Sequence, residues 1–276
     1  DGRPDILRPD AWFEAPADRW RWVEQGLRLL REDGLRYNPR DPRLYWELGW
    51  IYHHKIGGST DPASGYYRAR LFDAMAAILP DGRGGSPVEA GSLQTRFGLE
   101  PARMAEVDRT VGPLDWRLPE SHALYWAWCG RRQAGSPPDL MLERLFYQSM
   151  MMTALQGGFL DETLQGSAVR RIRTDLFPAA LAVLDEARRR FPDDPGIAAA
   201  AFRFERKAVV LYFARREDAA AQALWERRFG GTGGADALRR FVQEQAEQGM
   251  LTESTFLGEL HALLVEADLA RQRGEA

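Results

Sequence analysis

Two short proline motifs constrain the fold of this chain more than any other feature. The segments NPRDP at 38–42 and FPDDP at 191–195 both place an aspartate directly before a second proline. The first proline ends a preceding helix, and the second fits the first turn of a new helix, where an absent N–H costs nothing. The aspartate can accept hydrogen bonds from free N–H groups at that helix start. Each motif therefore predicts a helix end, a tight turn and a helix start.

Hydrophobic spacing extends this prediction along the chain. Residues 17–37 carry large apolar side chains three and four positions apart, which is typical of one helix face. No segment alternates like a strand for more than four residues, so we expect an all-α fold. The expected helices span 17–37, 42–55, 66–79, 100–111, 119–131, 138–156, 175–190, 195–215, 217–229, 235–248 and 253–272.

The residues around the proline motifs resemble the tetratricopeptide repeat (TPR), a helix-turn-helix unit of about 34 residues. Tyr45, Leu48, Gly49 and Tyr52 match the first helix of that pattern, with Tyr45 in place of the usual tryptophan. The second-helix positions are matched by Ala180, Leu184, Ala187 and Pro192, and in part by residues 66–80. The resemblance implies an α-solenoid of antiparallel helix hairpins, and Gly49 is then expected to let a neighbouring helix approach.

The spacing of the matches predicts insertions and domain limits. The segments 80–98 and 156–168 are rich in glycine and lack periodicity, so we expect long loops there. We expect an N-terminal extension at 1–16, a degenerate TPR-like domain at 17–230 and a C-terminal helical hairpin at 235–276. A repeat array needs capping units, so we expect a further repeat upstream; the hypothesis extends to an upstream anchor that tethers the domain to a bacterial-type membrane.

Composition excludes several function classes. The 276 residues carry a net charge of −3, which argues against nucleic-acid binding through bulk charge. The single cysteine, Cys129, cannot form a disulfide within the chain. No apolar run is long enough to insert into a membrane.

Adjacent His53 and His54 lack the spacing of helical metal ligands, and no cofactor motif is present. We therefore expect neither a metal nor a cofactor, and the compartment, the oligomeric state and the identity of the partner stay open.

Two functions remain from different classes. The first, implied by the resemblance, is a non-catalytic scaffold that binds a protein or peptide. The alternative is a small-ligand receptor or enzyme that uses loops 80–98 and 156–168 as pocket walls; a catalyst should bury convergent ionisable groups beneath them. The aromatic and cationic side chains of segment 115–128 either form a surface that binds the partner or fill the core between repeats. Candidate partner-binding residues, several of them expected to be exposed, are Trp46, His53, Trp116, Arg117, His122, Tyr125, Trp126 and Arg203.

Overall fold

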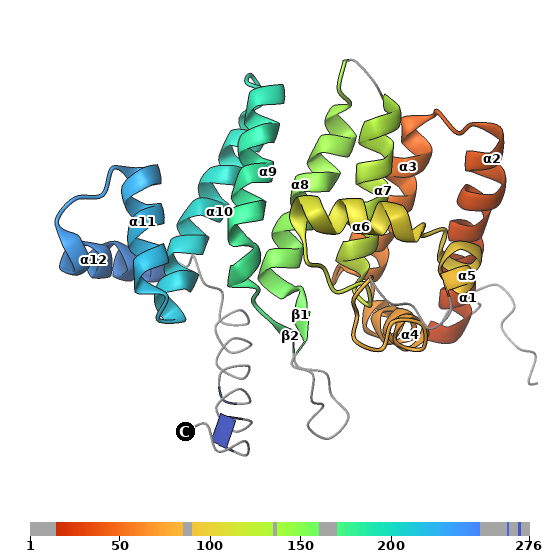
Figure 1. Ribbon diagram of the computed structural model, residues 1–276, viewed down its shortest axis with the longest axis horizontal. Coiled ribbons are helices and arrows are strands. Elements are labelled where there is room, and N and C mark those ends of the chain that lie inside the picture. Colours follow the sequence, from red (N-terminus) through yellow and green to blue (C-terminus); the bar gives the residue numbers. More distant parts are fainter. Residues whose placement is uncertain are drawn as a thin grey trace, which may run out of the picture. The chain divides into compact units, whose positions relative to one another are not determined.

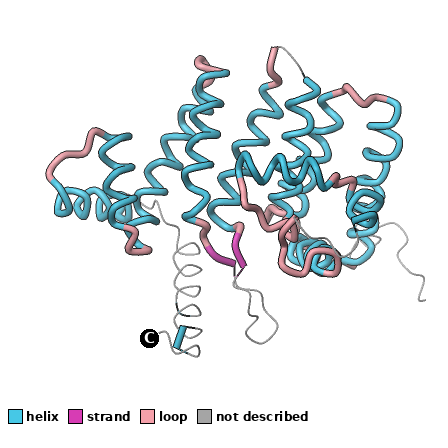
Figure 2. Tube along the Cα trace, viewed as in Figure 1, coloured by secondary structure: helices cyan, strands magenta, loops and turns pink. Residues whose placement is uncertain are grey.

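The fold is all-α. The computed structural model describes residues 15–84, 90–134, 137–159 and 170–248, together with 264, 270 and 271. In this part of the chain the regular elements are helices, apart from one antiparallel pair of two-residue strands (Figure 2). Strand β1 (Gly158–Phe159) pairs with β2 (Arg170–Arg171) so that Gly158 lies opposite Arg171. The predicted fold class is confirmed, and the solenoid arrangement stays a proposal.

The chain divides into two compact units, Asp1–Ser149 and Met150–Ala276. The domain limits expected from the sequence at residues 16 and 230–235 stay predictions. In the first unit the elements are α1 (Pro16–Leu29), the π-helical η2 (Leu30–Gly34), α2 (Leu35–Tyr37), α3 (Pro42–Trp50), the π-helical η3 (Ile51–Ile56), α4 (Ser64–Ala76), α5 (Ala90–Ser92), the π-helical η4 (Leu93–Phe97), α6 (Pro101–Val111), α7 (Pro119–Ala134) and the greater part of α8 (Leu140–Gln156).

The expected helices are present over most of their length, with one correction. Residues 90–97 form α5 and η4, whereas the sequence predicted a loop throughout 80–98. Glycines at 82, 84, 85, 91 and 98 suggested a loop, but Leu93 and Phe97 lie one helical turn apart and are both buried. That burial holds the segment helical. The helix expected at 253–272 lies outside the described residues, apart from isolated positions.

The proline motifs act as helix starts. Asp41 accepts a hydrogen bond from the backbone N–H of Arg43 at 3.0 Å, and Asp194 accepts one from Ile197 at 3.0 Å. In both helices the following proline occupies the first turn. Each aspartate thus satisfies a backbone donor that the helix itself leaves unpaired.

Helix α3 packs directly against α7, although more than 60 residues separate them. The rings of Tyr45 and Trp126 lie 6.4 Å apart, and those of Tyr52 and His122 lie 4.6 Å apart. Residue number rises along α3 as it falls along α7, so the two helices are antiparallel (Figure 1). The sequence suggested α4 as the second helix after 42–55; α4 does contact η3, but α3 itself has α7 as its partner.

Glycines at the contact points allow this close packing. A Cβ atom at Gly49 would lie 2.6 Å from Leu145 Cδ2 on α8 and 3.3 Å from the Ala123 carbonyl oxygen on α7. A Cβ atom at Gly130 would lie 2.7 Å from both Leu142 Cδ2 and Tyr45 Cβ. Contacts this short would force the neighbours to move. The role expected for Gly49 as a point of close helix approach is therefore confirmed.

Residues 57–118 form an insertion between two helices that contact each other. Its helices α4, α5, η4 and α6 pack on the outside of the α1, α3 and α7 group, and α6 lies across α7 (Figure 1). On one side, Tyr67 of α4 stacks on Trp20 of α1 with ring centroids 5.7 Å apart. This insertion supplies one wall of the site described below.

The second unit contains the end of α8 and four further α-helices among its described residues. These are α9 (Phe177–Arg190), preceded by the 3₁₀ turn η5 (Thr174–Leu176), α10 (Pro195–Ala214), α11 (Asp218–Phe229) and α12 (Gly234–Glu247). Phe177 packs edge-on against Phe204 and Tyr212 of α10, with centroids 5.6 and 5.0 Å apart. Apolar burial therefore joins α9 to α10.

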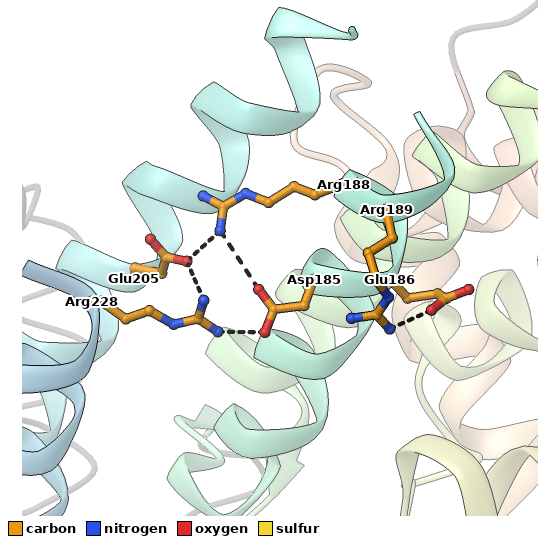
Figure 3. Close-up of polar contacts among 6 residues, drawn as sticks. All are labelled: Asp185, Glu186, Arg188, Arg189, Glu205 and Arg228. Carbon is orange, nitrogen blue, oxygen red and sulfur yellow. Dashed lines mark hydrogen bonds and ion pairs between the residues drawn. The ribbon is translucent and has the colours of Figure 1, made fainter. Parts of the chain in front are cut away.

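A network of ion pairs connects α9, α10 and α11 (Figure 3). Glu205 is 4% exposed and lies 2.8 Å from Arg188 and 3.5 Å from Arg228. Arg228 also donates to Asp185 at 2.5 Å. Burial tends to raise the pKa of Asp185, but the hydrogen bond and charge of Arg228 bring that pKa below its ordinary value. The buried carboxylate of Glu205 is thus compensated from two neighbouring helices.

Candidate functional site

Most of the predicted partner-binding residues lie in the core. Trp116, His122, Tyr125 and Trp126 are each at most 4% exposed, and Arg117 is 8% exposed. The expectation that His122 and Trp126 are exposed was therefore wrong. These side chains fill the space between α3, α7 and the insertion, where aromatic rings meet edge to face. Tyr125 contacts Trp116 and Trp126 in this way, at centroid distances of 6.3 and 5.2 Å.

The candidate on α3, Trp46, and the candidate on η3, His53, differ in exposure. Trp46 is partly exposed and begins a stack of three rings one helical turn apart: its ring lies 5.0 Å from Trp50, which lies 3.5 Å from His54. His53 was expected to be exposed but is buried, with its Nδ1 atom 3.0 Å from Ser149 Oγ. Arg203 on α10, in the second unit, is exposed as expected.

A groove in the first unit runs between η2 and the insertion. It comprises two pockets of about 190 and 290 Å³ that share Arg31, Glu32 and Thr95. The first pocket has apolar side chains from α1, η3, α4 and η4; these are Trp20, Leu27, Tyr52, Leu71 and Phe97. The second adds residues from α3, α6 and α7; these include Tyr45, Glu100, Arg103, Tyr125 and Trp126. Of the sequence candidates, Tyr125 and Trp126 therefore line the groove.

Two π-helical segments, η2 and η4, face each other across this groove. Arg31 of η2 donates a hydrogen bond to the carbonyl oxygen of Arg96 in η4 at 2.8 Å. Gly98 ends η4 with a φ of 69°, and a Cβ atom there would lie 2.7 Å from Arg31 Cδ. A side chain at position 98 would therefore displace Arg31. Such π-helical turns occur frequently at functional sites.

The floor of the groove is fixed by hydrogen bonds from a core tyrosine. The Tyr125 hydroxyl accepts from the backbone N–H of Glu100 at 3.0 Å and donates to the Gly98 carbonyl at 3.3 Å. These bonds hold the turn that joins η4 to α6. Burial raises the pKa of Tyr125, so its hydroxyl stays protonated and keeps both roles at neutral pH.

Buried charges lie near the end of the insertion, but they bind one another. Arg117 donates to both carboxylate oxygens of Asp115, at 2.9 and 2.6 Å, and to the Pro80 carbonyl at 2.8 Å. Trp116 donates through Nε1 to Asp108 at 3.0 Å and through its backbone N–H to Gly82 at 2.8 Å. This clasp attaches residues 80–82 to segment 115–117. It gives Asp115 and Arg117 a positioning role in the fold.

Two buried histidines lie near these elements, and both are neutral at pH 7. Burial lowers the pKa of His122 to about 4, and its Nε2 atom lies 3.0 Å from the Trp116 carbonyl. Burial likewise lowers the pKa of His53 to about 4. The contact of His53 with Ser149 resembles the first pair of a nucleophilic triad, but both side chains are buried and neither lines the groove pockets.

A third pocket, of about 260 Å³, adjoins the groove at Arg103 and contains Cys129 in its lining. Burial raises the pKa of the Cys129 thiol to about 11, so the thiol is protonated at neutral pH. Arg103 lies 4.0 Å from the sulfur and pairs with Glu100 at 3.0 Å.

In the described ranges no three His, Cys, Asp or Glu side chains cluster closely enough to hold a metal ion.

In comparisons with known proteins, no protein-family model, curated protein or solved structure matches the chain. The fold by itself assigns the chain to the all-α class. Within the part of the chain that the structure describes, no helix has the length and apolar character needed to cross a membrane.

Of the residues that line the groove, the sequence did not single out Arg31, and it predicted a loop at residues 93–97. One signal could have revealed the partner of α3. Ala123, Ala127 and Gly130 repeat the spacing of four and three found at Ala180, Leu184 and Ala187, with small residues at the first and third positions.

Proposed function

We propose that this protein is a non-catalytic scaffold of TPR-like type that binds a peptide or protein segment in the groove between η2 and the insertion. The observation that carries the proposal is the groove itself, in which two adjoining pockets share Arg31, Glu32 and Thr95. Successive pockets lined by aromatic and arginine side chains suit successive side chains of an extended peptide, because such residues supply most interface energy.

The TPR-like part of the proposal is supported by helix packing. Gly49 and Gly130 bring α3, α7 and α8 into close mutual contact, as a repeat of antiparallel helices requires. The net charge of −3 favours a protein or peptide partner over nucleic acid.

One observation favours the alternative, a small-ligand receptor. Part of segment 80–98 lines the pockets: Thr95, Arg96 and Phe97 line the first, and Gln94, Thr95 and Gly98 line the second. Each pocket can hold an amino-acid side chain, and the two adjoin each other, as successive side chains of an extended peptide require. This arrangement favours the peptide function. Enzymatic activity has less support, because the buried charges of the insertion bind one another.

A matched pair of threonines tests this function. Thr95 and Thr110 are both exposed, and each donates to the carbonyl four residues earlier at 2.9 Å. Only Thr95 lies in the groove. Peptides would be selected from a random displayed library on the wild-type protein and then titrated against Thr95→Trp and Thr110→Trp.

We expect Thr95→Trp to weaken the selected peptides at least about tenfold, because the indole occupies the junction of the pockets, and Thr110→Trp to leave their affinity unchanged. Equal affinity for both variants, or a library that yields no binding peptide, would refute the proposed function. Melting curves of the two variants control for folding.

A further inference from the structure

Among the described residues Arg31, at the centre of the groove, forms no ion pair with a carboxylate, and we propose that it binds a carboxylate of the incoming peptide. The occupant is a segment with a large apolar side chain next to an aspartate or glutamate. The apolar side chain enters the first pocket, and the carboxylate meets Arg31 where the two pockets join. This inference rests on the proposed peptide-binding function and specifies the chemistry of the partner.

The contacts of Arg31 carry the inference. Its guanidinium is partly buried and donates to the Arg96 carbonyl, and it forms no ion pair with any carboxylate among the described residues. Two other partly buried arginines of the same unit have acidic partners: Arg103 pairs with Glu100 at 3.0 Å, and Arg131 with Glu143 at 3.2 Å. An arginine fork is suited to bidentate binding of a carboxylate, which adds both energy and direction.

The charges around Arg31 favour an anion. In the first pocket the lining includes three arginines, at 28, 31 and 96, and two glutamates, at 24 and 32. Arg28 and Arg96 are exposed to solvent, so Arg31 is the most buried of the three cations. In the second pocket Arg103 and Glu100 neutralise each other. The groove as a whole has four arginines and three glutamates in its lining, so its net charge is positive by one.

Apolar surface lies next to this charge. Trp20, Leu27 and Leu71 line the first pocket together with Tyr52, which is 1% exposed. Burial raises the pKa of Tyr52 while the nearby Arg31 acts in the opposite direction, so the phenol and the cation are electrostatic neighbours. A pocket of about 190 Å³ accommodates a phenylalanine or leucine side chain. The groove is therefore expected to select peptides in which an apolar residue stands next to an acidic one.

Phenylacetate and phenylacetamide form a probe pair for the site. They have nearly the same shape, and only phenylacetate carries a charge. Each would be titrated into ¹⁵N-labelled protein while the side-chain Nε–Hε signal of Arg31 is followed. We expect phenylacetate to shift that signal and to bind about tenfold or more tightly than the amide, because charge-assisted hydrogen bonds are the stronger ones. Equal affinities would overturn the carboxylate site.

Two variants and a peptide complete the test. Arg31→Gln should bind phenylacetate as weakly as the amide, whereas Arg36→Gln, an exposed change on the same helix outside both pockets, should behave as wild type. An end-capped peptide containing Phe-Glu should displace phenylacetate, and its Phe-Gln counterpart should need about ten times the concentration. Failure of the Phe-Glu peptide to compete would overturn the peptide occupant and favour a free carboxylate. The titration against Thr95→Trp tests whether a peptide binds in the groove at all, and the Arg31→Gln titration tests only the carboxylate site. The two proposals can therefore fail separately.

Discussion

Gly49 of α3 lies so close to Leu145 of α8 that a Cβ atom at position 49 would be 2.6 Å from Leu145 Cδ2. The Ala123 carbonyl limits the space on the other side, at 3.3 Å. This contact joins three helices that are not all consecutive in the chain. Only glycine allows it without movement of a neighbour.

We therefore predict that Gly49→Ala lowers the free energy of unfolding by about 1–3 kcal/mol through overpacking. Gly26→Ala is the matched control, because Gly26 also lies inside a helix and a Cβ atom there would meet nothing within 4 Å. The control should gain about 0.5–1 kcal/mol from helix propensity. Urea titrations of both variants measure the difference, and a stabilised Gly49→Ala would contradict the packing described for α3.

Glu205 provides a second stability test, in the second unit. Glu205→Gln removes the charge that compensates Arg188 and Arg228, so we expect a loss of about 2–4 kcal/mol. Glu186 pairs with Arg189 at 2.5 Å on the surface (Figure 3), and Glu186→Gln should cost at most about 0.5 kcal/mol. Thermal or urea unfolding of the two variants gives the comparison; equal losses would mean that the network contributes no more than a surface pair.

His122 makes stability depend on pH in a direction that can be calculated. Its pKa is about 4 in the folded protein and about 6.5 when unfolded, so below pH 6.5 the unfolded chain binds a proton that the folded chain does not. The stability present above pH 6.5 is therefore lost as the pH falls toward 4, by about 1 kcal/mol per pH unit between 6.5 and 5. His53 adds a similar dependence.

The variant His122→Gln isolates this contribution, because glutamine keeps an N–H donor for the Trp116 carbonyl but cannot titrate. Its unfolding free energy should fall less steeply with decreasing pH, by about 1 kcal/mol per unit. The measurement is a series of urea titrations between pH 7 and 5. Parallel curves for the variant and the wild type would show that His122 is not buried as a neutral group.

The helices were predictable because their signals are local. Asp41 and Asp194 precede prolines, and apolar residues recur three and four positions apart, so the positions of most helices followed from neighbouring residues. The pairing of α3 with α7 was not predicted, because an insertion of residues 57–118 separates the two halves of one packing unit. The nearest later helix, α4, was the natural choice from sequence order.

The candidate site was predicted less well, for a related reason. Trp116, His122 and Trp126 have the composition of a binding surface, but aromatic side chains serve the core equally well, and here all three are buried. The groove depends on Arg31 and Thr95, which are 64 positions apart and ordinary in local context. Only the fold brings η2 and η4 together.

The central claim is that the groove beside the insertion, and not the stacked rings of α3, is the partner surface. Hydrogen exchange tests it most directly, with a library-selected peptide bound to the wild-type protein. We predict slower exchange at the backbone amides of residues 28–35 and 93–98 on binding, and unchanged exchange at 46–54, where Trp46, Trp50 and His54 form the ring stack. Protection confined to 46–54, with exchange at 93–98 unaltered, would contradict the account.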